Sequence, residues 1–173
     1  TVSKENVVSN LGLLRRLYSN IVLAFDADRA GFNASTRAAK IALSFGMDVK
    51  VVSMPEGVDP ADLIGKDGND AWRSSVRNSK HIIEFILEKV LAHSNQDERL
   101  AGREIRKEVL PYVGALESAI EQAHFLGKIS HLSGISEEVL RTDMAKIEKE
   151  ANETHGELAG ISERNANLFR RDH

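Results

Sequence analysis

The sequence contains no cysteine, only three prolines and one tryptophan, and no long apolar run. Without cysteine there can be no disulfide framework, thiolate nucleophile, iron-sulfur cluster or zinc ribbon, so any metal must bind to oxygen or imidazole ligands. The apolar run Ile21–Phe25 is far shorter than the roughly 18 residues that a membrane span needs. These absences predict a soluble cytoplasmic protein that does not interact with membranes.

The chain also has no large excess of either charge, because 23 basic and 26 acidic residues leave a formal net charge of -3. This balance argues against nucleic-acid binding through bulk positive charge, so any such binding has to be local. The 173 residues, 42% of them hydrophobic, are enough for a real core.

The first part of the chain alternates between helical and strand-like hydrophobic periods. The expected elements are a helix over residues 3–18, a strand over 20–25, a helix over 30–45 and a strand near 49–52. Gly46 stands where the second helix should end. This order predicts part of a parallel α/β sheet with flanking helices, in which both strands are buried. Two strands alone are too few for independent stability.

Beyond Pro60 no strand-like run occurs, and the periodicity predicts a helical bundle. Pro111 is expected to end one helix and Gly134 another. The expected helices cover residues 82–91, 100–110 and 116–129, and a last one begins at Ser136. The chain is therefore expected to be α/β followed by all-α.

Three segments follow from these patterns. Residues 1–78 are expected to form the partial α/β unit and residues 79–151 the helical subdomain. Residues 152–173 have few apolar residues and no sustained period, which predicts a flexible tail or linker.

Two carboxylates stand directly after the first strand, in Phe25-Asp26-Ala27-Asp28-Arg29-Ala30-Gly31. In an open parallel sheet, ligands gather at the carboxyl ends of the strands. Asp26 and Asp28 would repel one another there unless a cation lay between them, and carboxylate oxygens suit magnesium. The alternative is that both are ordinary turn and N-cap residues.

A second acidic cluster, Glu56-Gly57-Val58-Asp59-Pro60-Ala61-Asp62, follows the second strand. If the two strands are parallel neighbours, both clusters lie at the same edge of the sheet, and Asp59 can share the cavity of the first pair. Asp59 is otherwise a turn residue. Asp62 is expected to be a first-turn carboxylate of a helix.

Together, the two acidic clusters and their spacing resemble the second half of the TOPRIM domain of bacterial-type DNA primases. The segments Ala123-His124-Phe125-Leu126 and Ser133-Gly134-Ile135-Ser136 are similar to the helical subdomain that follows TOPRIM in that family. The resemblance covers roughly residues 1–150.

The resemblance implies a nucleotidyltransferase that makes short RNA primers on single-stranded DNA during replication, from nucleoside triphosphates and with Mg²⁺ or Mn²⁺. It implies that Asp26 and Asp28 are catalytic metal ligands and that Asp59 is a further metal ligand. Arg29 is a candidate phosphate contact or a solvated helix-start residue. A replicative helicase is the implied partner of a full-length primase, and zinc is not expected in this chain.

Two departures from the family pattern stand out. Ala61 replaces an aspartate that normally follows the proline of the second cluster. The glutamate that opens the TOPRIM pattern, in a strand-turn-glycine motif, has no counterpart before Asp26, since Glu5 falls in a helical pattern. We therefore expect a fragment of a primase catalytic core that does not synthesise primers by itself.

Three rival interpretations remain at this point. A haloacid-dehalogenase-like phosphatase also places Asp-x-Asp after a strand, but it requires a downstream lysine and another paired-aspartate strand end. Other TOPRIM enzymes of nucleic acids, such as topoisomerases and nucleases, share the acidic pair. A non-catalytic binding module is the third. The six histidines show no ligand spacing and are expected at the surface or the edge of the core.

Overall fold

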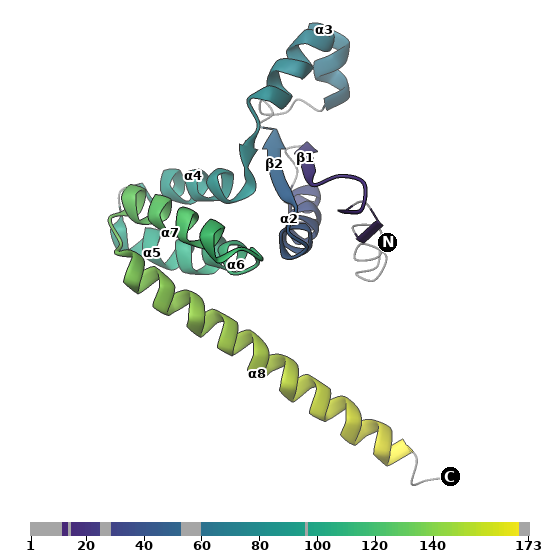
Figure 1. Cartoon of the computed structure of the whole chain (residues 1–173), viewed down its shortest axis with the longest axis vertical. Helices are drawn as coiled ribbons and strands as arrows, with labels where there is room; N and C mark the ends of the chain where they lie inside the picture. Colours follow the sequence, from purple (N-terminus) through teal and green to yellow (C-terminus); the bar gives the residue numbers. More distant parts are fainter. Residues whose placement is uncertain (1–11, 14, 25–28, 53–59, 96, 170–173) are drawn as a thin grey trace.

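A small sheet and a helical bundle share one hydrophobic core in the computed structural model of this chain (Figure 1). The structure describes the backbone of residues 12–13, 15–24, 29–52, 60–95 and 97–169. Side chains are described for residues 12–13, 15–24, 36–52, 65, 69–95 and 97–153. The helix expected over residues 3–18 therefore falls mostly outside the described residues.

Two parallel strands joined by a crossover helix form the first part of the fold. Strand β1 covers Asn20–Ala24, helix α2 covers Arg29–Ser44 and strand β2 covers Asp48–Val52. The register pairs Asn20 with Asp48 at one edge and Ala24 with Val52 at the other. The parallel α/β arrangement predicted from the hydrophobic periods is confirmed.

Gly46 ends α2, as predicted. Its φ of 68° lies in the left-handed region that favours glycine. The Gly46 N–H donates to the carbonyl of Leu43, and the Met47 N–H donates to that of Ala42. Those two bonds satisfy carbonyls that the helix end would otherwise leave unpaired. The chain then enters β2 immediately.

A third strand was not predicted from the sequence. Helix α3 covers Pro60–Arg77, and the two-residue strand β3, Lys80–His81, pairs antiparallel with β2. The expectation of no strand beyond Pro60 was wrong, because two polar residues are too few to show a period. The sheet is mixed, in the order β1-β2-β3.

The two longer strands differ in burial. Val49, Val51 and Val52 of the central strand β2 are at most 2% exposed. Val22 of β1 is 43% exposed, because β1 is an edge strand within the described part of the sheet. The prediction that both strands are buried holds for β2 and was wrong for β1.

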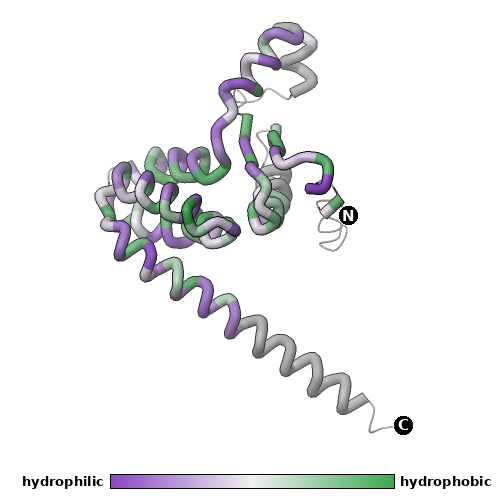
Figure 2. Tube along the Cα trace, viewed as in Figure 1, coloured by the Kyte–Doolittle hydropathy of each residue, from purple (hydrophilic) through white to green (hydrophobic). Residues whose placement is uncertain are grey.

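The helices after β3 form the rest of the core. They are α4 (Ile82–Ser94), α5 (Glu98–Glu104), the π-helical turn η1 (Ile105–Val109), α6 (Leu110–Val113), α7 (Ala119–Ser133) and α8 (Glu137–Phe169). Their most deeply buried side chains are Ile82, Ile83, Leu87, Ile105, Val109, Leu110, Val113, Leu126 and Ile129. Figure 2 shows hydrophobic stretches along α4 and α6. The predicted helical bundle is confirmed.

Pro111 does not end a helix, contrary to the prediction. Proline has no N–H to donate, and within a regular helix its ring collides with the carbonyl four residues earlier. Here the Leu110 N–H donates to the carbonyl of Ile105, five residues back, which widens the turn ahead of the proline. Pro111 then occupies the first turn of α6, where a missing N–H costs nothing.

Helix α8 continues to Phe169, well past Asn152, where the sequence pattern fades. In Figure 1 it extends away from the other helices. The predicted helix stop at Gly134 is confirmed by its φ of 73°. The division at residues 78 and 151, and the role of residues 152–173 as a tail or linker, stay predictions. Within the described residues, no helix is long and apolar enough to cross a membrane.

Replacement of Leu126 by alanine tests the shared core. Leu126 is fully buried in α7, so we expect Leu126→Ala to lower the free energy of unfolding by about 2–5 kcal/mol. Ile120 on the same helix is 83% exposed, and Ile120→Ala should change it by less than about 0.5 kcal/mol. Urea denaturation followed by circular dichroism measures both, and equal effects would contradict the packing described.

Candidate functional site

The carboxyl ends of β1 and β2 lie side by side, since Ala24 and Val52 are register partners. Both strands point toward the end of the molecule where α3 lies (Figure 1). The segments that contain the predicted acidic residues continue from these two strand ends. This pairing meets the condition set by the sequence analysis, that both acidic clusters follow neighbouring parallel strands.

The predicted site residues themselves are not described. Asp26, Asp28 and Asp59 lie outside the described residues, and Arg29 is described only as the first residue of α2. Their roles as catalytic residues, metal ligands and phosphate contact therefore stay predictions. Among the side chains that are described, no group of three acidic or histidine residues is placed to hold a metal ion.

The start of α2 adds a feature that suits an anion. The helix begins at Arg29, soon after the carboxyl end of β1, and its first turn has no acidic residue. Helix N-termini present free N–H groups and a partial positive charge, which favours phosphate. This edge of the sheet thus combines a helix N-terminus with the two strand ends.

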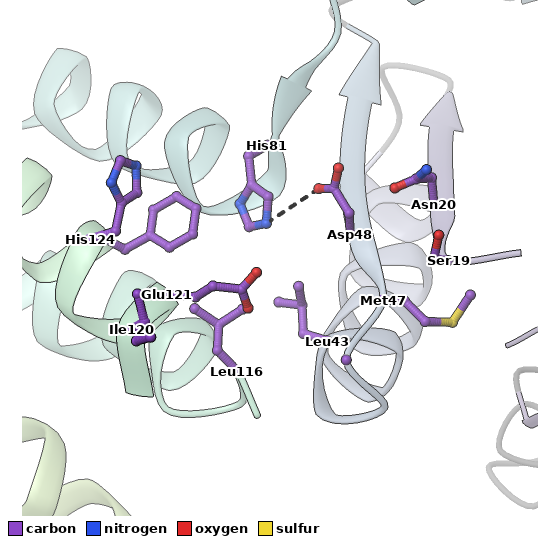
Figure 3. A pocket seen from close by; sticks show the side chains of 12 residues that line it. Ser19, Asn20, Leu43, Met47, Asp48, His81, Leu116, Ile120, Glu121 and His124 are labelled. Atoms are coloured by element: carbon purple, nitrogen blue, oxygen red, sulfur yellow. Dashed lines mark ion pairs between the residues drawn. The ribbon is translucent and has the colours of Figure 1, made fainter. Parts of the chain in front are cut away.

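A cavity of about 530 Å³ lies at the opposite edge of the sheet, where β1 and β2 begin (Figure 3). Asn20 and Asp48 line it from the strand starts, and His81 lines it from the end of β3. Glu121 and His124 line it from α7. The cavity therefore lies between the sheet and the helical bundle.

His81 connects the elements around this cavity. Its Nδ1 accepts a hydrogen bond from the Ile83 N–H at 3.2 Å and so caps α4. Its Nε2 lies 3.8 Å from Oδ1 of Asp48 on β2. Its ring packs on the ring of Phe125 in α7, with centroids 4.4 Å apart. One side chain thus touches the sheet and two helices.

Burial lowers the pKa of His81 below its ordinary value of 6.5. The carboxylates of Asp48 and Glu84 oppose this shift, while Lys50 and His124 reinforce it. The imidazole is therefore neutral at pH 7. Because Nδ1 accepts the Ile83 N–H, the hydrogen of the neutral ring is on Nε2, which faces Asp48.

From the sequence, His81 is expected only at the surface or the edge of the core. The structure places it at the core edge, with 15% of its side chain exposed. Asp48 was not singled out at all. Neither residue carries a local signal, since histidine is not a preferred N-cap and their contact joins strands far apart in the sequence.

Comparison with known proteins shows which families and proteins this chain resembles. Residues 2–64 match a family described as Toprim-like. The chain is 32% identical to a DNA primase of Staphylococcus aureus over 165 residues. The aligned part covers 88% of this chain and 27% of that protein. The chain therefore spans about a quarter of the length of the curated relatives it matches.

Solved structures agree with these sequence relatives. A DNA primase domain from Pseudomonas aeruginosa superposes with a TM-score of 0.65 at 22% identity, over 84% of this chain and 46% of that one. The RNA polymerase domain of a Mycobacterium tuberculosis primase, solved with double-stranded DNA, gives a TM-score of 0.53 at 26% identity. That superposition covers 76% of this chain and 42% of the primase domain.

The chain thus forms a small α/β sheet followed by a helical subdomain, and its first part matches the Toprim-like family. The particular relatives are bacterial-type DNA primases, and the resemblance inferred from the sequence is confirmed.

The lowered pKa of His81 predicts how stability depends on pH. The unfolded chain takes up the proton at a higher pH than the folded chain, so the free energy of unfolding falls as pH drops below about 6.5. His81→Asn keeps an acceptor for the Ile83 N–H but does not titrate. In this variant the free energy of unfolding should therefore decrease less as the pH drops.

Urea midpoints at about pH 7.5 and 5.5 measure this dependence. The control is His93→Asn, since His93 is exposed at the end of α4. If the two variants lose the same share of the pH dependence, burial of His81 is not its cause.

Proposed function

We propose that this chain is part of the catalytic core of a DNA primase, which joins ribonucleotides into short primers on a DNA template. The observation that carries the proposal is similarity to DNA primases along 88% of the chain. The paired strand ends at Ala24 and Val52 support it, because the two acidic segments follow these neighbouring strand ends in the sequence.

In this proposal Asp26, Asp28 and Asp59 hold divalent metal, Mg²⁺ or Mn²⁺. Three carboxylates form a hard-oxygen donor set that fits these ions, and their segments leave adjacent strands. When bound, such an ion supplies positive charge that stabilises the attacking and departing oxygens of in-line nucleotidyl transfer. Arg29 and the N-terminus of α2 hold phosphate groups of the nucleotide at the same edge.

The proposed substrates are nucleoside triphosphates and a single-stranded DNA template. DNA as a partner is supported by the M. tuberculosis primase domain, whose structure contains double-stranded DNA. A replicative helicase is the proposed partner of the full-length protein, and the cytoplasm, where bacterial DNA is copied, is the proposed location.

The rival enzymes are less well supported. A haloacid-dehalogenase-like phosphatase needs a second paired-aspartate strand end, and the described strand after β2 consists of Lys80 and His81. Topoisomerases and nucleases share the acidic pair, but the similarity to primases continues through the helical subdomain.

Removal of the acidic pair tests the metal assignment. The double variant Asp26→Asn with Asp28→Asn loses two ligands without a change in size, so Mn²⁺-dependent binding of a fluorescent nucleoside triphosphate should weaken more than about tenfold. Asp70→Asn is the matched control, because Asp70 is an exposed aspartate of α3. Unchanged binding by the double variant, with both proteins folded, would favour a binding module without a metal site.

A separate expectation concerns the 173-residue chain on its own. It contains Asp26 and Asp28 but no counterpart of the TOPRIM glutamate, so we expect no template-dependent RNA synthesis from it alone. Incubation with single-stranded DNA, labelled nucleotides and Mg²⁺ or Mn²⁺ measures this. Primer-length products from the pure chain, absent in the double aspartate variant, would contradict the expectation.

A further inference from the structure

We propose that the cavity between the sheet and the helical bundle binds a small organic cation with an apolar body. It lies at the edge where β1 and β2 begin, opposite the strand ends proposed to hold metal. Its apolar floor, inward-facing carboxylate and aromatic wall come from elements far apart in the sequence (Figure 3). The inference does not depend on primase activity.

The floor of the cavity is apolar. Leu43 lines it from the last turn of α2 and Met47 from the turn before β2, while Leu116 and Phe125 line it from the bundle. All four side chains are at most 7% exposed. A volume of about 530 Å³ is within the range of small-molecule sites, which are mostly apolar with a few polar groups.

The polar groups favour a positive ligand. The Glu121 carboxylate points into the cavity in Figure 3 and has no hydrogen bond or ion pair with the described residues. Asp48 lies across from it, 3.8 Å from Nε2 of His81 and 3.6 Å from Nζ of Lys50. Both distances exceed a good hydrogen bond, so this carboxylate can still accept from a ligand.

Aromatic faces complete the wall. The Phe125 ring lies between His81 and His124, with centroids 4.4 Å and 5.2 Å away. Aromatic rings attract cations through their negative faces and stack on flat ligands. Because burial lowers the pKa of His81, its ring adds no positive charge at pH 7 that would repel the ligand.

Ile120 supports an apolar body on the ligand. The structure leaves this apolar side chain 83% exposed where it lines the cavity. A ligand seated between the Glu121 carboxylate and the Phe125 ring would cover part of this side chain, which gives apolar burial in addition to charge.

Benzamidine is a suitable probe, and benzamide, which is neutral and nearly the same shape, is its matched control. Titration of the ¹⁵N-labelled chain near pH 7 should shift amide signals of Asp48, Ile120, Glu121 and His124 with benzamidine. Glu121→Gln should weaken benzamidine binding about tenfold, as expected for loss of a hydrogen bond between charged groups. Glu138→Gln, an exposed carboxylate on α8, should leave the affinity unchanged.

Three results would overturn the proposal. One is equal affinity for benzamide and benzamidine, which would mean an apolar cavity without charge selectivity. The second is a set of shifted signals that excludes the cavity residues, and the third is unchanged affinity in a folded Glu121→Gln. Because Glu121 is exposed and makes no side-chain bond with described residues, this variant is expected to fold, and its thermal midpoint verifies that.

Discussion

The pairing of β2 with both of its neighbours is the constraint on which the rest of the molecule depends. Val49 and Val51 are fully buried, and β2 contacts α2 of the crossover as well as α4 of the bundle. Its parallel register with β1 fixes where both strands start and end. Its pairing with the two residues of β3 attaches the helical subdomain to the sheet, since His81 leads directly into α4.

This register separates two chemical environments at opposite edges of the sheet. The acidic segments follow Ala24 and Val52 in the sequence, and α2 begins soon after Ala24, so we propose that metal-bound phosphate groups lie at this edge. The edge at Asn20 and Asp48 faces the bundle across a cavity with an apolar floor. A ligand in that cavity would touch both the sheet and α7 without approaching the strand ends.

The sequence was sufficient to predict the elements that have a clear hydrophobic pattern. It predicted β1, α2, β2 and the helix stop at Gly46, and the similarity to DNA primases followed from the acidic clusters. Prediction from the sequence failed where a feature depends on contacts with residues far away in the chain. Strand β3 is two polar residues held by β2, and Pro111 fits a helix only because η1 widens the turn before it. The cavity joins Asp48, His81 and Glu121, and no local pattern connects them.

We propose that a divalent metal ion binds beside the paired strand ends and not beside the strand starts. Substoichiometric Mn²⁺ added to the ¹⁵N-labelled chain tests it directly, because the bound ion broadens nearby amide signals. The account predicts strong broadening at Ala24 and Val52, weak broadening at Asn20 and Asp48, and loss of the effect in the double variant Asp26→Asn with Asp28→Asn. Equal broadening at both edges, or broadening that persists in the double variant, would contradict it.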